Sequence, residues 1–164
     1  MATNNHDWNE VLSFLGKEAQ FLDQRNWDAW LDLYLPEAEY WVPAWDDDGQ
    51  LISDPQSEIS LIYYANRGGL EDRVYRIKTG RSSATMPLRR TTHLYNLLSI
   101  EKTSGGFKVK TNWQVHSCKE YVTISYYGNA EYILKQTDDG LKIIKKKTVV
   151  NNDSATTMMD IYTI

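Results

Sequence analysis

Cysteine is nearly absent from this chain of 164 residues, and histidine is scarce, with one Cys and three His. Cys118 cannot form an internal disulfide, which is typical of proteins from a reducing compartment. An iron–sulfur cluster held by four Cys, or by two Cys and two His, is therefore excluded. A mononuclear iron site needs two His and a carboxylate, and His6, His93 and His116 lack the i, i+4 spacing of a helical ligand pair. The sequence predicts no metal site on this chain.

Long apolar runs and glycine-rich phosphate loops are also missing. No stretch of about 18 apolar residues occurs, and the first residues lack the basic and apolar segments of a signal peptide. We therefore expect a soluble cytoplasmic protein that does not bind a membrane. Arg67-Gly68-Gly69 lacks the spacing of a dinucleotide fingerprint, and the acidic triplet at 46–48 lacks the 12-residue pattern of a calcium loop. The sequence thus predicts no cofactor-binding residues.

The net charge of −4 is small, but its distribution along the chain is uneven. Residues 1–60 hold thirteen Asp and Glu against two Lys and Arg, whereas residues 61–164 hold nine against sixteen. Attraction within the chain would explain this, and so would complementary faces in an oligomer, where opposite charges guide docking. Nucleic acid is not an expected partner, because the chain is acidic overall and carries no motif of a nucleic-acid-binding fold.

Aromatic residues are plentiful, with six Trp and eleven Tyr, and the length suits a single domain spanning residues 1–164. An apolar pattern with helical spacing predicts a first helix from Asp7, read as its cap, to Gln24. Asn26 can cap a second, short helix that ends at Pro36. Residues 39–43 then favour a short strand, which Pro43 confines to an edge or an end of a sheet.

The central stretch, residues 57–93, predicts the longest helix, from about residue 58 to residue 78. Gly68-Gly69 interrupts its apolar stripe, which indicates a kink or a close backbone contact. Arg73 falls within that stripe, where an unpaired guanidinium would be costly. We therefore expect Arg73 to pair with Asp72 or with an acid of the N-terminal helices.

Strands dominate from His93 onward, at about residues 94–101, 107–118, 129–135 and 141–150. The second of these alternates strictly between apolar and polar residues, with Phe107, Val109 and Trp113 predicted to point inward. Asp138-Asp139-Gly140 predicts a hairpin turn, and residues 158–164 predict a final docked strand. Helices that precede an antiparallel sheet indicate an α+β fold, with the helices packed on one face of a curved sheet.

Four motifs in this order resemble the small (beta) subunit of bacterial aromatic-ring-hydroxylating dioxygenases, and most of all the benzoate, toluate and anthranilate dioxygenase branch. They are EISLIYY (58–64), GLEDRVYRI (69–77), RSSATMP (81–87) and RTTH (90–93). FLD (21–23) and DIY (160–162) extend the resemblance over nearly the whole chain.

The resemblance implies a nuclear-transport-factor-2-like (cystatin-like) cone. It also implies a non-catalytic structural subunit of a complex that cis-dihydroxylates a benzoate-like or anthranilate-like acid in aromatic catabolism. The expected partners are a large (alpha) subunit and further copies of this chain, with three large and three small chains in a hexamer. The large subunit is expected to carry a Rieske [2Fe–2S] cluster and mononuclear Fe(II), and NADH would act through a separate reductase.

No residue of this chain is predicted to be catalytic, and the candidate residues belong to subunit interfaces. They are Arg67, Arg73, Arg76, Arg81, Arg89, Arg90 and His93. His93 is otherwise read as a hydrogen-bonded structural histidine. Two alternatives use the same fold: a ligand-binding module, and a free-standing isomerase or dehydratase with a buried acid or base inside the cone. Candidate groups for such an enzyme are Asp23, Asp32, His93 and Tyr40.

Overall fold

The computed structural model describes residues 4–80, 86–153 and 158–164. Three helices and six strands form within these residues, with two helices first and the long strands last. In chain order they are α1 (Asn5–Asp23), α2 (Trp27–Leu31), β1 (Tyr34–Pro43), β2 (Ser60–Tyr64), α3 (Arg67–Thr79), β3 (Arg90–Thr103), β4 (Gly106–Lys119), β5 (Val122–Thr137) and β6 (Gly140–Val150). No helix in the described ranges is long and apolar enough to cross a membrane.

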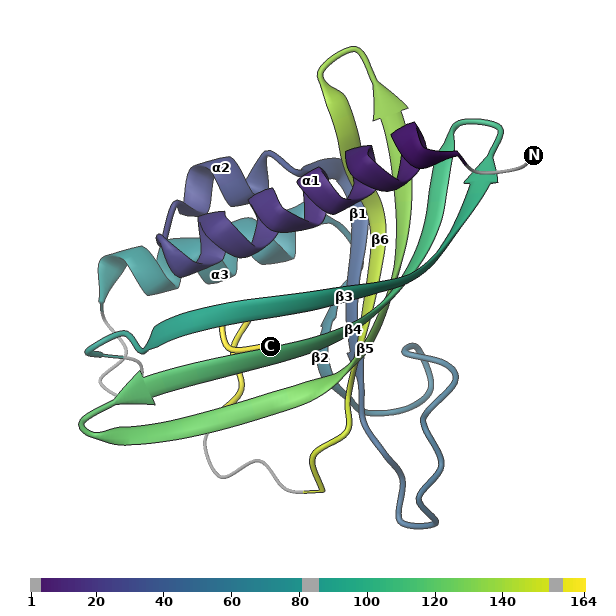
Figure 1. Ribbon diagram of the computed structural model, residues 1–164. Coiled ribbons are helices and arrows are strands. Elements are labelled where there is room, and N and C mark those ends of the chain that lie inside the picture. Colours follow the sequence, from purple (N-terminus) through teal and green to yellow (C-terminus); the bar gives the residue numbers. More distant parts are fainter. Residues whose placement is uncertain (1–3, 81–85, 154–157) are drawn as a thin grey trace.

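The six strands form one sheet in the order β2-β1-β6-β5-β4-β3. Neighbouring strands run antiparallel except β1 and β6, which pair in parallel although about a hundred residues separate them. Figure 1 shows the sheet strongly curved, with the three helices gathered on one side of it. The helix α1 packs along β3, and α3 packs against β1 and β2. The expected arrangement of helices on one face of a curved sheet is therefore confirmed.

The core lies between the helices and the sheet and is rich in aromatic rings. Inward-facing residues of β4 alternate with exposed or half-buried ones, as the sequence pattern predicts. Large side chains that are almost fully buried come from α2, β1, β5 and the end of the chain: Trp30, Tyr34, Tyr40, Tyr126, Tyr132 and Ile161. Tyr and Trp carry polar atoms, so a core of this kind needs hydrogen-bond partners inside it.

The long helix predicted over residues 58–78 is wrong in its first part. Residues 60–64 form β2, which pairs with β1, and α3 begins at Arg67. The side chain of Asn66 caps α3 by accepting a hydrogen bond from the backbone N–H of Gly68 at 2.9 Å. Leu70 and Val74 are buried as expected, whereas Ile59, read as part of the same stripe, is 88% exposed. Apolar residues at 59–63 fit a strand as well as a helix, and pairing with β1 decides between the two.

Gly69 explains why the chain can turn so tightly between β2 and α3. A Cβ atom on Gly69 would overlap the ring of Tyr64, whereas a Cβ on Gly16 of α1 would meet nothing within 4 Å. The close contact expected at Gly68-Gly69 is thus confirmed at Gly69.

We expect Gly69→Ala to lower the free energy of unfolding by about 1–3 kcal/mol, as overpacking does. Gly16→Ala is the matched control and should raise it by about 0.5–1 kcal/mol, because Ala favours a helix. Denaturant unfolding of both variants measures this, and equal effects would contradict the explanation.

The strands β1, β3 and β5 are longer than predicted, and two helix boundaries also differ from the sequence prediction. Asn4, not Asp7, caps α1, and Asp7 accepts a hydrogen bond from the backbone N–H of Asn4 in a capping box. The second helix ends at Leu31 rather than at Pro36, which lies within β1. The cap at Asn26 and the position of Pro43 at the end of β1 are confirmed.

The C-terminal segment, residues 158–164, is docked as predicted but forms a turn instead of a strand. Ile161, Tyr162 and Ile164 are each less than 4% exposed. Asp160 accepts hydrogen bonds from the Nε–H of Arg73 at 2.8 Å and from an Nη–H of the same residue. Side-chain burial and this ion pair therefore hold the segment, and no backbone ladder is involved.

Candidate functional site

An isomerase or dehydratase with this fold would need a reactive acid or base in the interior of the cone. Glu18 projects from α1 into the core and is 0% exposed. Lys146 of β6 reaches it from the opposite side, with 2.7 Å between Nζ and Oε1. Tyr34 donates its hydroxyl to Oε1 at 3.1 Å, and Tyr132 donates to Oε2 at 2.9 Å. Both carboxylate oxygens of Glu18 are therefore occupied by groups of this chain.

Aromatic rings complete the surroundings of this ion pair. The ammonium of Lys146 lies 5.2 Å from the ring centre of Tyr132 and 5.9 Å from that of Tyr40, within the range of cation–π attraction. Burial, together with the negative charge of Glu18, raises the pKa of the Tyr34 and Tyr132 hydroxyls well above the ordinary value. The two tyrosines therefore stay neutral and serve as hydrogen-bond donors.

These contacts of the Glu18 carboxylate are thus all with side chains of its own chain. Four hollows lined by described residues lie at the surface, and neither Glu18 nor Lys146 lines any of these four. Of the other candidates for an acid or base, Asp32 is exposed, and burial raises the pKa of Tyr40. The geometry thus gives no support to a free-standing isomerase or dehydratase.

Sequence reasoning missed Glu18 and Lys146, although each leaves a weak signal. Glu18 lies between Leu15 and Leu22 on the apolar stripe of α1, where a charge is out of place. Lys146 lies between Lys145 and Lys147, and alternation along a strand places it on the opposite face from these two, which both lie over the ring of Trp41. A lysine on the inward face needs a buried anion.

A second polar cluster joins the end of α1 to the start of β3. His93 Nδ1 lies 2.6 Å from Asp23 Oδ1, and the backbone N–H of His93 donates to Oδ2 at 3.1 Å. Thr91 donates its hydroxyl to Oδ1 at 2.9 Å. The side chain of His93 is fully buried, so the reading of His93 as a hydrogen-bonded structural histidine is confirmed.

These contacts determine how the Asp23 carboxyl titrates. Burial alone would raise its pKa, but the hydrogen bonds and the charge of His93, with the bond from Thr91, lower it below the ordinary 3.8. A lowered pKa means that this stabilisation is present above pH 3.8 and is lost as the pH falls through the folded-state value.

We expect Asp23→Asn to cost about 1.5–3 kcal/mol at pH 7, because hydrogen bonds to a charged acceptor are lost. The gap between the unfolding free energies of variant and wild type should narrow at pH 3, because below pH 3.8 the unfolded wild-type chain takes up a proton at Asp23 more readily than the folded chain. Guanidinium unfolding at the two pH values measures both effects. Asp32→Asn, at an exposed position, is the control and should show neither effect. A gap that is unchanged at pH 3 would contradict the proposed role of Asp23.

The predicted interface arginines fall in two places. Arg67 pairs with Glu71 at 2.8 Å and donates to the backbone carbonyl of Tyr34 at 3.0 Å, and Arg76 is exposed on α3. Arg73 is paired with Asp160 and not, as expected, with Asp72 or an acid of the N-terminal helices.

Arg89 and Arg90 form the second place, at the start of β3. Arg89 is half-buried and Arg90 is exposed. The remaining candidate, Arg81, lies outside the described residues. Three of the candidates, Arg67, Arg73 and Arg76, thus lie on α3, while Arg89 and Arg90 lie at the start of β3.

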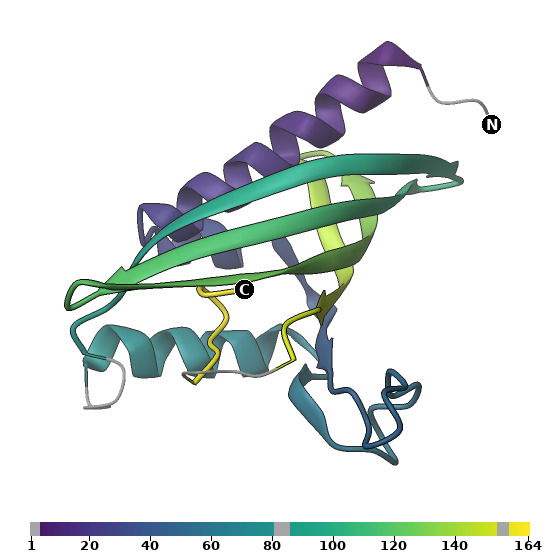
Figure 2. The ribbon, with the colours of Figure 1, turned by 60° about the horizontal axis from the view of Figure 1, so that its bottom comes forward.

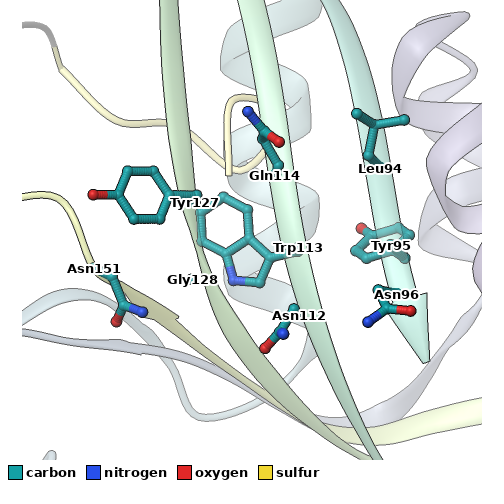
Figure 3. A pocket seen from close by; sticks show the side chains of 9 residues that line it. All are labelled: Leu94, Tyr95, Asn96, Asn112, Trp113, Gln114, Tyr127, Gly128 and Asn151. Atoms are coloured by element: carbon teal, nitrogen blue, oxygen red, sulfur yellow. The ribbon is translucent and has the colours of Figure 1, made fainter. Parts of the chain in front are cut away.

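The sheet also carries a shallow hollow on the face turned away from the helices (Figure 3). Asn96, Asn112 and Asn129 stand in register across β3, β4 and β5. The hollow measures about 510 Å³, and uncharged side chains line it: Leu94, Tyr95, Asn96, Asn112, Trp113, Gln114, Tyr127 and Asn151, with Gly128. It offers no cation for the carboxylate of an aromatic acid, so it does not support the alternative of a module that binds such acids.

The described ranges of the chain contain no group of three or more His, Cys, Asp or Glu that could hold a metal ion. Asp46 accepts hydrogen bonds from the backbone N–H groups of Asp48 and Gln50, at 3.0 and 2.7 Å. The acidic triplet therefore belongs to a surface turn.

Fold and interior together define a class: an α+β cone whose inside is filled by its own side chains. A structure of a nuclear-transport-factor-2-like protein with a cystatin-like fold from Novosphingobium aromaticivorans shares this fold, with a TM-score of 0.63, 12% identity, and coverage of 93% of this chain and 86% of the other. The predicted fold class is thereby confirmed.

Residues 17–157 match the model of the family described as ring hydroxylating beta subunit, and the chain belongs to that family. It is 46% identical to the benzoate 1,2-dioxygenase subunit beta of Acinetobacter baylyi over 94% of this chain and 92% of the relative. It is 44% identical to the toluate 1,2-dioxygenase subunit beta of Pseudomonas putida, over 93% and 94%.

A crystal structure of the beta subunit of the benzoate 1,2-dioxygenase from Burkholderia mallei matches with a TM-score of 0.77 and 41% identity, and all of both chains is covered. The resemblance drawn from the four sequence motifs is therefore confirmed. This chain is a small subunit of an aromatic-ring-hydroxylating dioxygenase of the benzoate, toluate and anthranilate type, and small subunits of this family pair with large oxygenase subunits.

Proposed function

We propose that this chain is a purely structural subunit that organises the oxygenase without supplying a catalytic group. The network around Glu18 carries this proposal, because Lys146, Tyr34 and Tyr132 of the same chain occupy both oxygens of this buried carboxylate. In this proposal the chain acts as one domain of residues 1–164. It works in the cytoplasm of a bacterium, where NADH is available.

The iron centres then belong to the large subunit. A Rieske [2Fe–2S] cluster needs two Cys and two His, and a mononuclear iron needs two His and a carboxylate. One Cys cannot supply the cluster, and the imidazole of His93 is already held by Asp23. In our proposal the large subunit binds both iron centres, and electrons reach it from NADH through a separate reductase.

The proposed assembly contains three large and three small chains. Positions for subunit contacts are Arg67, Arg73, Arg76, Arg81, Arg89, Arg90 and His93, as the sequence indicates. Exposure of Arg76 and Arg90 favours direct contact with another subunit. A planar guanidinium can bind a carboxylate there through bidentate hydrogen bonds. Arg73 and His93 are held by acids of their own chain, so their part in an interface would be to position neighbours.

The proposed substrate is a benzoate-like or anthranilate-like acid, which the complex cis-dihydroxylates in aromatic catabolism. The names of the relatives support this class, since they act on benzoate, 2-halobenzoate, toluate and anthranilate. The chain shares 46%, 42%, 44% and 37% identity with these four, respectively.

Co-expression with a large subunit and a reductase of a benzoate-type dioxygenase tests the proposal. We expect one stable complex that contains iron and consumes NADH with benzoate or a substituted benzoate. The small chain purified by itself should contain no stoichiometric iron and turn over no substrate. Iron bound to the lone chain, or a large subunit that assembles and works equally well without it, would contradict the proposal.

A further inference from the structure

The hairpin between β4 and β5 ends in a tip with no role in the packing of its own chain. Tyr121 at this tip is fully exposed (104%), and Val122 beside it is 56% exposed. Glu120 and Tyr121 both adopt left-handed backbone, with φ of 51° and 67°. A two-residue turn of this kind favours Asn-Gly, and a bulky aromatic residue is disfavoured in it. Figures 1 and 2 show this turn projecting at the left end of the long strands.

Positive charge surrounds the base of this tip. Lys119 lies opposite Val122 in the ladder, and its Nζ donates to the backbone carbonyl of Met86 at 2.9 Å. Arg90 lies opposite Cys118, with 3.8 Å between its Nη2 and the sulfur.

A further cation, Arg25, donates to the backbone carbonyls of Leu88 and Arg89 at 3.1 and 3.2 Å, close to the same base. Within the described parts of the chain, Arg25, Arg90 and Lys119 have no carboxylate partner. The tip is therefore an exposed aromatic ring on a cationic base, the pattern of an interface anchor.

A surface of the opposite character lies far from the tip on the same molecule. A hollow of about 520 Å³ is lined by Trp45, Asp46, Asp47, Gly49, Asn151 and Asp153. Trp45 is 46% exposed, and its Nε1–H donates to the backbone carbonyl of Val150 at 2.7 Å, which holds the indole in place. The hollow thus presents an apolar wall with a carboxylate rim.

The two surfaces complement each other in charge. Figures 1 and 2 both show the loop of residues 44–58 at the opposite side of the molecule from the hairpin tip, so a chain cannot fill its own hollow. We propose that the Tyr121 tip of one copy docks in the Trp45 hollow of the next, with Arg90 and Lys119 facing Asp47 and Asp153. This inference rests on the proposed structural function and names the contact between small subunits.

The contact would join two different surfaces, and repetition of such a heterologous contact by rotation closes a ring. Three copies in a ring agree with the proposed hexamer. The uneven charge along the sequence acquires a function in this arrangement, because the acidic first part of one copy would guide the basic remainder of the next.

Cross-linking in the assembled complex tests the contact. In a Cys118→Ser background, Tyr121→Cys and Asp47→Cys are introduced on one chain, and the complex with the large subunit is mildly oxidised. We expect covalent dimers and trimers of the small chain on a denaturing gel. The control chain carries Tyr127→Cys, on the outer sheet face, with Asp47→Cys, and should stay monomeric.

Only monomers from the Tyr121→Cys chain, or a cross-link to the large subunit instead, would overturn the proposed contact.

Tyr121→Gly adds an independent measurement, because Gly suits the left-handed turn and should leave the melting temperature equal or higher. Association between small chains should nevertheless weaken at least tenfold. Unchanged association would overturn the inference while the complex with the large subunit still supports the structural function. Failure of the wild-type chain to bind a large subunit would overturn the structural function instead. Oxidation of the small chain alone, with the same cysteine pairs, would then still show whether two copies form the proposed contact.

Discussion

Replacement of Glu18 by Ala is expected to destabilise the fold by about 3–5 kcal/mol, the usual cost of removing one partner of a buried ion pair. The reason is that Lys146, with its side chain 3% exposed, would remain in the core without the carboxylate that pairs with it. Tyr34 and Tyr132 would also lose the acceptor of their hydroxyls. Because a domain is stable by only about 5–15 kcal/mol, the variant should lose a large part of the free energy of unfolding. Chemical denaturation followed by circular dichroism measures the loss.

Two further variants separate the charge effect from a general effect of mutation. Gln20→Ala, on the exposed side of the same helix, should change the stability by less than about 0.5 kcal/mol. The double variant Glu18→Met with Lys146→Met should be less destabilised than the sum of the single variants, since both charges leave the core together. Additive losses would show that the two side chains do not act as a pair.

Removal of residues 158–164 should have an effect of similar or larger size. Three large side chains, Ile161, Tyr162 and Ile164, would leave the core, and each buried side chain of this size contributes about 1.5–3 kcal/mol. Arg73 would also lose Asp160 as its partner. The expected result is a chain without a cooperative thermal transition and without near-ultraviolet circular dichroism.

Milder changes in the same segment provide the controls. Met158→Ala, at a position that is 73% exposed, should shift the melting temperature by less than about 2 °C. Asp160→Asn should lie between the two, because the apolar contacts remain while the charge is lost. A truncated chain that melts like the wild type would refute the view that this segment completes the core.

Much of the fold could be predicted because its signals are local. The alternation along β4, the hairpin at Asp138–Gly140 and the cap at Asn26 each depend on residues close together in the sequence. The boundary between β2 and α3 could not be predicted in the same way. Its apolar residues satisfy either period, and the strand β1, some twenty residues earlier, decides the outcome.

The ion pairs of the interior could not be predicted either, because their partners lie far apart in the sequence. Glu18 and Lys146 are 128 residues apart, and Arg73 and Asp160 are 87 apart, so no spacing rule links them. Sequence alone could show that Arg73 needed a partner, but the acid nearest along the chain, Asp72, is not the one that pairs with it. Tertiary structure selects the acid that the fold brings within reach.

The parallel pairing of β1 with β6 sets the order in which the protein can be completed during synthesis. The strand β1 leaves the ribosome early, yet its neighbour in the middle of the sheet is the last long strand to be made. Until residue 150 has emerged, β1 and β5 each present an unpaired edge that can bind other chains. Translation that stalls before β6 should therefore yield aggregates and chaperone-bound chains, and final closure of the sheet should be a late, post-translational event.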